Sequence, residues 1–231
     1  MYTALNPIDT PNNYYFGRTV DFSDKISPSM FFFPRKHIWQ NSSSSKIINK
    51  YCFLGIGKKL SKVILTEGIN EKGVSVIALY FRKSQVCDSS SNSQKHKIES
   101  LDMVNFLLGN CSNIEEAYII LKNTSIIEVK NDIVDSAVPI TWVISDRSNK
   151  CLIVENTQDG LQITSNLTGI LVNYTKYLSF MNLQTLTYYF KTYCNNSICY
   201  IRMTGELIKS NKLMEIGKIS DLNKFQLLKD I

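Results

Sequence analysis

Few side chains in this sequence have a type and spacing that could do chemistry, and the first of them lie near its start. Arg18 and Asp21 stand three residues apart at the end of an aromatic, β-like run, where they could form an ion pair. Tyr2 carries a phenol, whose ordinary pKa near 10 leaves it roughly 0.1% ionised at neutral pH. Thr3 is expected to be an ordinary strand threonine, and Tyr80, which follows an apolar run, is expected in the core.

The six cysteines and two histidines form no metal-binding pattern. None of the cysteines belongs to a Cys-x-x-Cys pair, and Cys194 and Cys199, the nearest two, have no histidine at ligand spacing. The chain opens without a basic segment followed by an apolar one, so we expect a cytoplasmic protein with reduced thiols that pack as small apolar groups. We expect His37 and His96 at the surface, and neither a metal nor a cofactor.

Length and composition indicate one domain over residues 1–231. With 44% hydrophobic residues, a chain of 231 residues can bury roughly 70% of the surface that it exposes when unfolded. The net charge of +6 comes from lysines spread along the whole sequence, which argues against a nucleic-acid partner. No apolar run approaches the ~18 residues that a membrane-spanning helix needs, so no membrane partner is expected.

The hydrophobic pattern is mostly that of strands. Short β-branched and aromatic runs predict strands at residues 14–22, 30–33, 51–56, 74–81, 140–145, 151–155 and 169–172. Two helical patterns interrupt them, one at residues 101–108 and one that begins at Ser112, where Ser112 and Glu115 have the spacing of a capping box. Polar stretches at 41–46 and 87–97 are predicted to be exposed loops. This order predicts an α+β fold.

Five segments, in order along the chain, resemble the choloylglycine hydrolase and penicillin V acylase family. They are residues 1–5 (MYTAL), 15–21 (YFGRTVD), 68–74 (GINEKGV), 140–146 with Val154-Glu155 (ITWVISD and VE), and 169–173 (GILVN). The resemblance implies the fold of N-terminal nucleophile hydrolases, a four-layer αββα sandwich of two antiparallel sheets. It implies a small-molecule N-acyl amide, such as a conjugated bile salt or penicillin V, as substrate or ligand.

The same resemblance assigns roles to residues that are far apart in the sequence. In the family, removal of Met1 exposes a cysteine, whose sulfur is the nucleophile and whose amine is the general base. Tyr2 stands at that position here. Arg18 would favour the thiolate and Asp21 would hold the amine.

Two further residues match family positions. Asn173 matches the asparagine that stabilises the oxyanion. Tyr80 matches a position that is asparagine in bile salt hydrolases and tyrosine in penicillin V acylases. Thr3 would serve as an N-terminal nucleophile only if two residues were trimmed.

The chain departs from the family in a second way. After residues 177–183 it passes directly to 188–193 and 198–204, which resemble the last strand pair, so an internal deletion is predicted near 183–188. The lost segment includes the late catalytic arginine, which Arg202 does not match. An opened sheet edge would favour self-association, so a homo-oligomer is one expectation.

Three functions stay open at this stage. The first is a degenerate, catalytically impaired family member. The second is an active amide hydrolase with a lesion at residue 2. The third is a non-catalytic protein that binds an acyl ligand.

Overall fold

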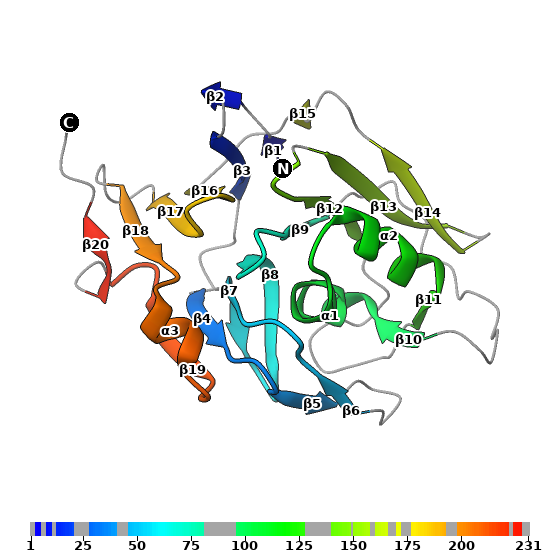
Figure 1. The fold of residues 1–231 in the computed structure, drawn as a ribbon, viewed down its shortest axis with the longest axis horizontal. Helices are drawn as coiled ribbons and strands as arrows, with labels where there is room; N and C mark the ends of the chain where they lie inside the picture. The colour runs from blue at the N-terminus through cyan, green and yellow to red at the C-terminus, as the bar shows by residue number, and fades with distance from the viewer. Residues whose placement is uncertain are drawn as a thin grey trace.

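The computed structural model describes residues 3–5, 8–10, 13–20, 28–40, 46–80, 96–127, 140–148, 150–157, 160–165, 170–171, 177–192, 198–221 and 224–227. Within these ranges, two antiparallel eight-stranded sheets, here sheet I and sheet II, form the body of the protein (Figure 1). The α+β sandwich of two antiparallel sheets that the sequence predicted is confirmed.

Sheet I brings together strands from both ends of the chain. Its order is β15-β1-β3-β16-β17-β18-β20, and β2 pairs with β3. These strands are β1 (Thr3–Leu5), β2 (Ile8–Thr10), β3 (Asn13–Val20), β15 (Ile170–Leu171), β16 (Tyr177–Asn182), β17 (Thr187–Thr192), β18 (Cys199–Arg202) and β20 (Gln226–Leu227).

Sheet II is built mainly from the middle of the chain, in the order β14-β13-β12-β9-β8-β7-β4-β19. These strands are β4 (Ser29–Phe33), β7 (Phe53–Lys59), β8 (Val63–Asn70), β9 (Ser75–Tyr80), β12 (Ile140–Ser145), β13 (Cys151–Thr157), β14 (Gly160–Ser165) and β19 (Met214–Lys218). The sequence patterns identified most of them but not β8, β14 or β19.

The main core lies between the two sheets. Because side chains alternate along a strand, every second residue of each sheet points into this space. Sheet I contributes Phe16, Met181, Tyr188, Phe190 and Cys199, and sheet II contributes Met30, Phe32, Leu54, Ile56, Ile69, Ile77, Leu79 and Val143. All of these are almost fully buried.

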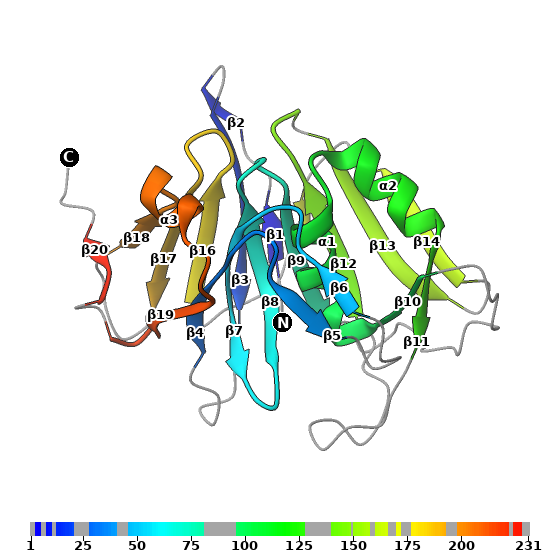
Figure 2. The ribbon, with the colours of Figure 1, turned by 60° about the horizontal axis from the view of Figure 1, so that its bottom comes forward.

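A second core lies between the outer face of sheet II and a helical layer (Figure 2). The layer consists of η1 (Ser100–Asp102), α1 (Met103–Asn110) and α2 (Ile114–Lys122), next to the parallel pair β10 (His96–Glu99) and β11 (Thr124–Ile127). A short third helix, α3 (Gly205–Lys209), instead packs Leu207 and Ile208 against the core between the sheets. Among the described residues, α1 and α2 thus form the helical layer of the expected αββα arrangement.

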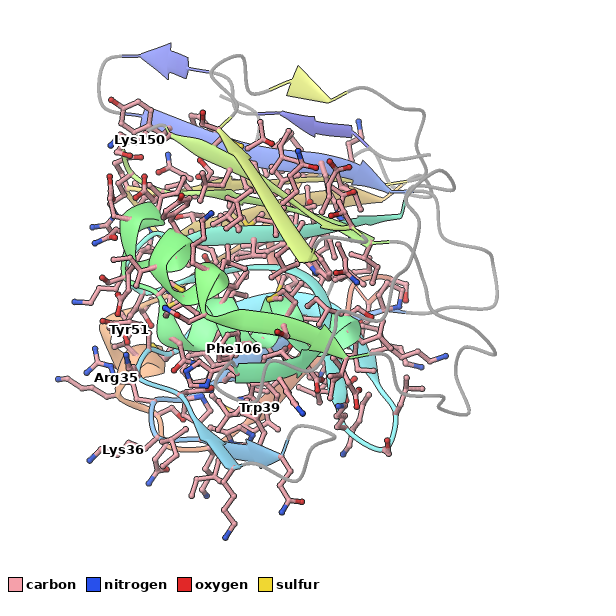
Figure 3. The ribbon with its side chains drawn as sticks, turned by 90° about the vertical axis from the view of Figure 1, so that its right-hand side faces the viewer. Arg35, Lys36, Trp39, Tyr51, Phe106 and Lys150 are labelled. Atoms are coloured by element: carbon pink, nitrogen blue, oxygen red, sulfur yellow. The ribbon has the colours of Figure 1, made fainter. Side chains whose placement is uncertain are left out.

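A small hairpin, β5 (Ile38–Gln40) paired with β6 (Lys46–Ile48), extends this second core. Its Trp39 packs against the same cluster as Phe106 of α1, and the two lie where the hairpin meets the helix (Figure 3).

The start of α2 differs from the prediction by one residue. The N-cap is Asn113, whose side chain accepts a hydrogen bond from the backbone N–H of Glu116 at 2.8 Å. Glu116, and not Glu115, reaches back to the backbone and hydroxyl of Ser112, at 2.8 and 2.7 Å. The contacts resemble a capping box, except that Glu116 accepts from Ser112, the residue before the N-cap, instead of from the N-cap residue itself.

A tight turn joins β16 to β17 at residues 183–186, where the sequence predicted an internal deletion. The side chain of Asn182 accepts hydrogen bonds from the backbone of Gln184 and Thr185, at 3.1 and 2.9 Å, and Leu186 adopts a positive φ of 53°. Strand β16 is hydrogen-bonded to β3 on one side and to β17 on the other. No sheet edge therefore opens between β16 and β17, and the expectation of a new edge that favours self-association stays a prediction.

Contacts from other elements hold this turn. Leu183 is fully buried, and its backbone N–H donates to the carbonyl of Tyr14 at 3.0 Å. Arg147, from the loop between β12 and β13, donates through Nε to the Leu183 carbonyl at 2.8 Å. Gly73 has a φ of +83°, and a Cβ there would lie 2.6 Å from Arg147 Nε, so only glycine fits beneath this contact.

The cysteine prediction is confirmed for the four cysteines that the structure describes. Cys52, Cys111, Cys151 and Cys199 are free and buried. Cys87 and Cys194 lie outside the described residues. Of the loops predicted at 41–46 and 87–97, residues 41–45 and 87–95 also lie outside them. The rest of each prediction is wrong, because Lys46 begins β6 and His96 and Lys97 belong to β10. No helix in the described ranges is long and apolar enough to cross a membrane.

Candidate active site

Strand β1 is the element that brings the predicted site segments together. It pairs antiparallel with β3, so that Thr3 lies opposite Thr19 and Ala4 lies opposite Arg18. On its other side it pairs with β15, where Ala4 lies opposite Leu171. Strand β1 thus lies directly beside the strand that carries Arg18.

Most of the predicted site residues cannot be placed at side-chain level. Tyr2, Asp21 and Asn173 lie outside the described residues. Tyr80 is the last residue of β9, where its backbone lies opposite Ile140. Its side chain is not among those that the structure describes. Convergence of these residues with Arg18 on one pocket therefore stays a prediction.

Arg18 is the predicted site residue whose side chain is described, and it points into the core between the sheets. It is 1% exposed. Its Nε donates to Glu67 Oε2, its Nη1 donates to the carbonyl of Ala78 at 2.7 Å, and its Nη2 donates to Thr66 Oγ1 at 2.9 Å. Three donors of one guanidinium thus fix its plane against strands β8 and β9.

Glu67 is a residue of this site that the sequence analysis missed. Its side chain is fully buried and forms an ion pair with Arg18. Its second oxygen, Oε1, accepts a hydrogen bond from Ser179 Oγ at 2.6 Å and another from the hydroxyl of Tyr188. We call Arg18, Glu67, Ser179 and Tyr188 the inter-sheet cluster.

A local irregularity of β8 brings Glu67 into position. The pairing with β7 shifts between Ile56 and Gly57, so that Thr66 is the extra residue of a bulge. The bulge lets Leu65 pack under the helices while Glu67 faces sheet I. The sequence signal for Glu67 was a charged residue at the end of the largely apolar run of residues 63–67. Its partner, Arg18, lies 49 residues away in the chain, and this local pattern does not predict that pairing.

The inter-sheet cluster satisfies the requirements for burying charge. A buried carboxylate or guanidinium is strongly destabilising unless it is paired and its remaining hydrogen-bonding groups find partners. Here each charge is balanced by the other, and donors or acceptors from β3, β8, β9, β16 and β17 surround the pair. The cluster therefore ties sheet I to sheet II through polar contacts within an otherwise apolar core.

The segment at residues 68–74 performs a structural function beside this cluster. Asn70 donates to the carbonyls of Leu108 and Cys111, at 2.9 and 2.7 Å, and accepts hydrogen bonds from the backbone of Lys72 and Val74 at 3.0 Å. These bonds shape the turn between β8 and β9 and attach it to the end of α1.

Glu71, in the same turn, joins it to the neighbouring strand. It accepts hydrogen bonds from Arg35 Nε at 2.7 Å and from the backbone of Cys52 at 2.9 Å. Burial would raise the pKa of the Glu71 carboxyl, but these hydrogen bonds and the Arg35 charge outweigh it and lower that pKa.

The described cysteines are poor candidates for a replacement nucleophile. Burial raises the pKa of the Cys52 and Cys151 thiols to about 12, and it also raises the pKa of Cys111 and Cys199. Within the described ranges, no group of three His, Cys, Asp or Glu side chains is placed to hold a metal ion.

Solved structures define the class of fold. The chain superposes with a TM-score of 0.83 on a variant of conjugated bile acid hydrolase from Clostridium perfringens, at 20% identity over 92% of this chain and 95% of that one. It superposes with a TM-score of 0.76 on penicillin V acylase from Agrobacterium tumefaciens, at 14% identity over 99% and 98% of the two chains. The fold is that of the N-terminal nucleophile hydrolases.

Sequence comparison gives the family. Residues 3–173 match the model of the linear amide C–N hydrolases, choloylglycine hydrolase family. The bile salt hydrolase/transferase of Clostridium perfringens is 30% identical over 178 residues, which are 75% of this chain and 53% of that protein. The chain belongs to the choloylglycine hydrolase family, whose members hydrolyse amide bonds of conjugated bile salts or penicillin V.

The sequence matches cover less of the chain than the structural superpositions do. The chain spans about half the length of the curated relatives it matches. The family model ends at residue 173, yet the superposition covers 92% of the chain and so extends into the strands after it.

Proposed function

We propose that this protein keeps the scaffold of a bile salt hydrolase or penicillin V acylase but does not turn over N-acyl amides. The observation that carries this proposal is the residue at position 2. Strand β1 begins at Thr3, so residue 2 directly precedes the strand that runs between β3 and β15. Tyrosine stands there in place of the cysteine nucleophile that the family resemblance requires.

A tyrosine does not replace a cysteine in this chemistry. At neutral pH a phenol with an ordinary pKa is roughly 0.1% ionised, against a few per cent for a thiol. The ring also sets the oxygen several ångströms beyond the position of a cysteine sulfur. A bulky second residue hinders removal of Met1, so the α-amino group that should act as the base is displaced. In comparable hydrolases, losing the nucleophile costs on the order of 10⁶ in kcat.

The described arginines support the loss of a second catalytic group. Arg147 donates to the carbonyl of Leu183 in the β16–β17 turn, and Arg202 donates to Thr187 Oγ1 at 3.2 Å. Both arginines therefore bond to the β16–β17 turn or to the start of β17, and the sequence around Arg202 does not match the motif of the family's late arginine. We infer that the internal deletion near 183–188 removed that arginine together with part of the substrate pocket.

The substrate class follows from the family. Its relatives are named for conjugated bile acids and for penicillin V, both of which join a large apolar acyl group to a polar amide. If any site persists here, its ligand is an N-acyl amide or the corresponding acid. Tyr80 favours the penicillin V acylase type, because that subgroup carries tyrosine at this position.

A non-catalytic ligand-binding role is the second candidate, and the β16–β17 turn favours it. Leu183 is fully buried there, and Tyr14 and Arg147 hold the turn by hydrogen bonds. A shortened chain that still closes its sheet in this way retains a stable scaffold on which an acyl group could bind.

One experiment separates these functions. The purified chain is incubated with glycocholate, taurocholate and penicillin V, and released glycine, taurine and 6-aminopenicillanic acid are measured, while native mass spectrometry detects any bound acyl ligand. We expect no release. A bound bile acid or phenoxyacetyl compound would support the binding role, and turnover that disappears with Asn173→Ala would refute the proposal.

Determining the codon for residue 2 tests directly whether Tyr2 is a lesion in an otherwise active enzyme.

A further inference from the structure

The outer side of the β5–β6 hairpin carries two large apolar side chains that are exposed to solvent. Ile38 is 56% exposed and Ile48 is 55% exposed. They lie directly opposite each other across the hairpin, and opposed residues of an antiparallel pair point to the same side. Single apolar residues are common on protein surfaces, but an adjacent pair surrounded by charge is a candidate contact surface.

The inner side of the same hairpin is the side that the fold uses. Trp39 and Ile47 pack there against the core between sheet II and the helices. Trp39 also donates through Nε1 to Asn49 Oδ1 at 3.1 Å. These contacts hold the hairpin on the body of the protein and leave its outer side available to another molecule.

The charge around the two isoleucines is of one sign. Residues 34–40 and 46–51 contain no Asp or Glu, but they contain four exposed basic residues, which are Arg35, Lys36, Lys46 and Lys50. Lys46 lies two residues before Ile48 in β6, so its side chain points to the same side as the isoleucines. Lys36 lies at the same end of the molecule as the hairpin (Figure 3).

Two of these cations keep their full charge. Lys36 and Lys46 form no ion pair with a residue that the structure describes, whereas Arg35 and Lys50 are partly neutralised by glutamates of neighbouring elements. The hairpin therefore presents an apolar pair beside uncompensated positive charge, and its complement is a surface that is both anionic and apolar.

The position of the hairpin suits a broad partner. Figures 1 and 3 both place β5 and β6 at the lower edge of the molecule, where a wide surface can approach them. A second copy of this chain would bring like charges together across the contact. A nucleic acid would pair the lysines with phosphates but leave both isoleucines against a polar backbone. The surface of an anionic lipid bilayer satisfies both kinds of side chain.

We propose that the outer side of the β5–β6 hairpin binds the surface of an anionic lipid bilayer. Ile38 and Ile48 insert among the headgroups, and Lys36 and Lys46 bind lipid phosphates. No membrane partner is expected from the lack of a spanning apolar run, but contact at the bilayer surface needs no such run. The proposal is independent of the proposed function, because it concerns residues outside the candidate active site.

The test measures binding of the purified full chain to vesicles by sedimentation. One set of vesicles is phosphatidylcholine with about 30% phosphatidylglycerol, and the other is phosphatidylcholine alone. We expect binding to the anionic vesicles to be at least about tenfold tighter, and to weaken as the NaCl concentration rises. Equal binding to the two sets, or none to either, would overturn the proposal.

A double lysine variant tests the charge of the hairpin. Lys36→Gln with Lys46→Gln should weaken binding to anionic vesicles by about 25-fold, which is about fivefold for each lysine. The matched control is Lys209→Gln with Lys212→Gln, which removes the same charge from exposed positions at and just after the end of α3. The control should weaken binding by less than about threefold. Equal effects of the two pairs would show that only net charge matters.

A second pair of variants tests the apolar contact without changing charge. Ile38→Ser with Ile48→Ser should weaken binding by at least about tenfold, and the exposure of both residues means that the fold should be kept. Urea unfolding checks this. Ile119→Ser is the control, because Ile119 of α2 is 61% exposed on a different element, and it should change binding by less than about twofold.

Tryptophan fluorescence reports directly on where the vesicles touch. The chain has two tryptophans, and Trp142 is 1% exposed in the core, so quenching by brominated phosphatidylcholine should come from Trp39 and disappear in Trp39→Phe. Quenching that persists in Trp39→Phe would place the contact elsewhere and overturn the proposal. If the serine pair binds vesicles as the parent does and poly-L-glutamate competes for the lysines, the partner is an acidic polymer and the lipid proposal is likewise overturned.

Discussion

At the scale of single residues, the inter-sheet cluster shows that a residue expected at an active site also takes part in the polar contacts between the two sheets. Arg18 was predicted from the family motif to lie near a nucleophile, and the structure pairs it with Glu67 in the core. The two functions are compatible, because the guanidinium has donors for several partners. The cluster also makes the fold depend on a few buried hydroxyl groups, which mutation can test.

Removing the hydroxyl of Tyr188 tests that dependence. Tyr188→Phe keeps the ring in the core but deprives Glu67 of a hydrogen bond, and a buried charged group that loses a partner costs about 1–3 kcal/mol. We expect urea unfolding to show a stability loss of this size. Tyr200→Phe, on a half-buried tyrosine of the neighbouring strand, is the control and should change stability by less than about 0.5 kcal/mol. Equal effects of the two substitutions would contradict the account of the cluster.

Glu71 makes stability depend on pH. Its folded-state pKa is lowered from 4.5, because hydrogen bonds and the charge of Arg35 outweigh the effect of burial. A lowered pKa contributes stability that is present above the unfolded value and is lost as the pH falls through the folded value.

Glu71→Gln should therefore destabilise the protein by about 1–3 kcal/mol at pH 7, and the difference should shrink below about pH 4.5. Chemical unfolding between pH 3 and 7 measures it. Glu206→Gln, on the exposed first turn of α3, serves as the control for loss of a charge. A difference that stays constant down to pH 3 would show that the ionised form of Glu71 does not stabilise the fold.

Thiol reactivity follows from burial. Because the described cysteines are buried and burial raises the pKa of Cys52 and Cys151 to about 12, none of these four thiols should react with iodoacetamide at pH 8 in the folded chain. All four should react in denaturant. Peptide mass mapping measures this, and rapid labelling of Cys52 in the folded protein would contradict it.

At the scale of elements, the β16–β17 turn lies where the sequence predicts an internal deletion. It holds Leu183 in the core and is attached to sheet II by Arg147. The hydrogen bond crosses between the two sheets, so it should contribute to their association.

Arg147→Ala removes this attachment and leaves the Leu183 carbonyl without its donor. We expect a loss of about 1–2 kcal/mol in the free energy of unfolding. Arg202→Ala, on an exposed arginine that donates to Thr187 Oγ1, is the matched control and should cost less than about 0.5 kcal/mol. If Arg147→Ala lowers the free energy of unfolding no more than Arg202→Ala does, the hydrogen bond from Arg147 to Leu183 does not stabilise the turn.

The elements also show what the sequence could predict. Strand β12 and the two helices follow from the local pattern of apolar residues. Residues 140–145 form a short apolar run that is buried throughout, α1 is also buried throughout, and α2 buries Ile114, Ala117 and Leu121 at helical spacing. Strand β8 was missed although residues 63–65 are β-branched or apolar, since Thr66, Glu67 and Gly68 interrupt the pattern. The partner of Arg18 could not be predicted from local pattern, because sheet pairing alone brings β3 and β8 together. The family resemblance supplied the fold and Arg18 as a site residue, but it gave no role to Glu67.

At the scale of the whole molecule, the protein has the fold of the family, and we propose that it lacks the family's chemistry. The two sheets and the α1–α2 layer superpose on family structures although identity is only 20%. The two proposed lesions, at residue 2 and near 183–188, should affect catalysis more than folding, because β1 pairs with strands on both sides and β16 pairs directly with β17.

The two lesions predict how a repaired chain behaves. Tyr2→Cys should restore removal of Met1 and give a reactive thiol, but little or no hydrolysis, since binding contacts of the missing segment normally support the chemical step. Hydrolysis of penicillin V at rates like those of full-length relatives would show that Tyr2 is the sole lesion.

The most direct measurement is a combined assay of the unmodified chain. Intact-mass analysis of the purified protein reports whether Met1 is present, and the same sample is assayed for release of glycine or taurine from conjugated bile acids and of 6-aminopenicillanic acid from penicillin V. The account predicts that Met1 is retained in front of Tyr2 and that no product forms above the uncatalysed rate. Product release that is abolished by Asn173→Ala would contradict it.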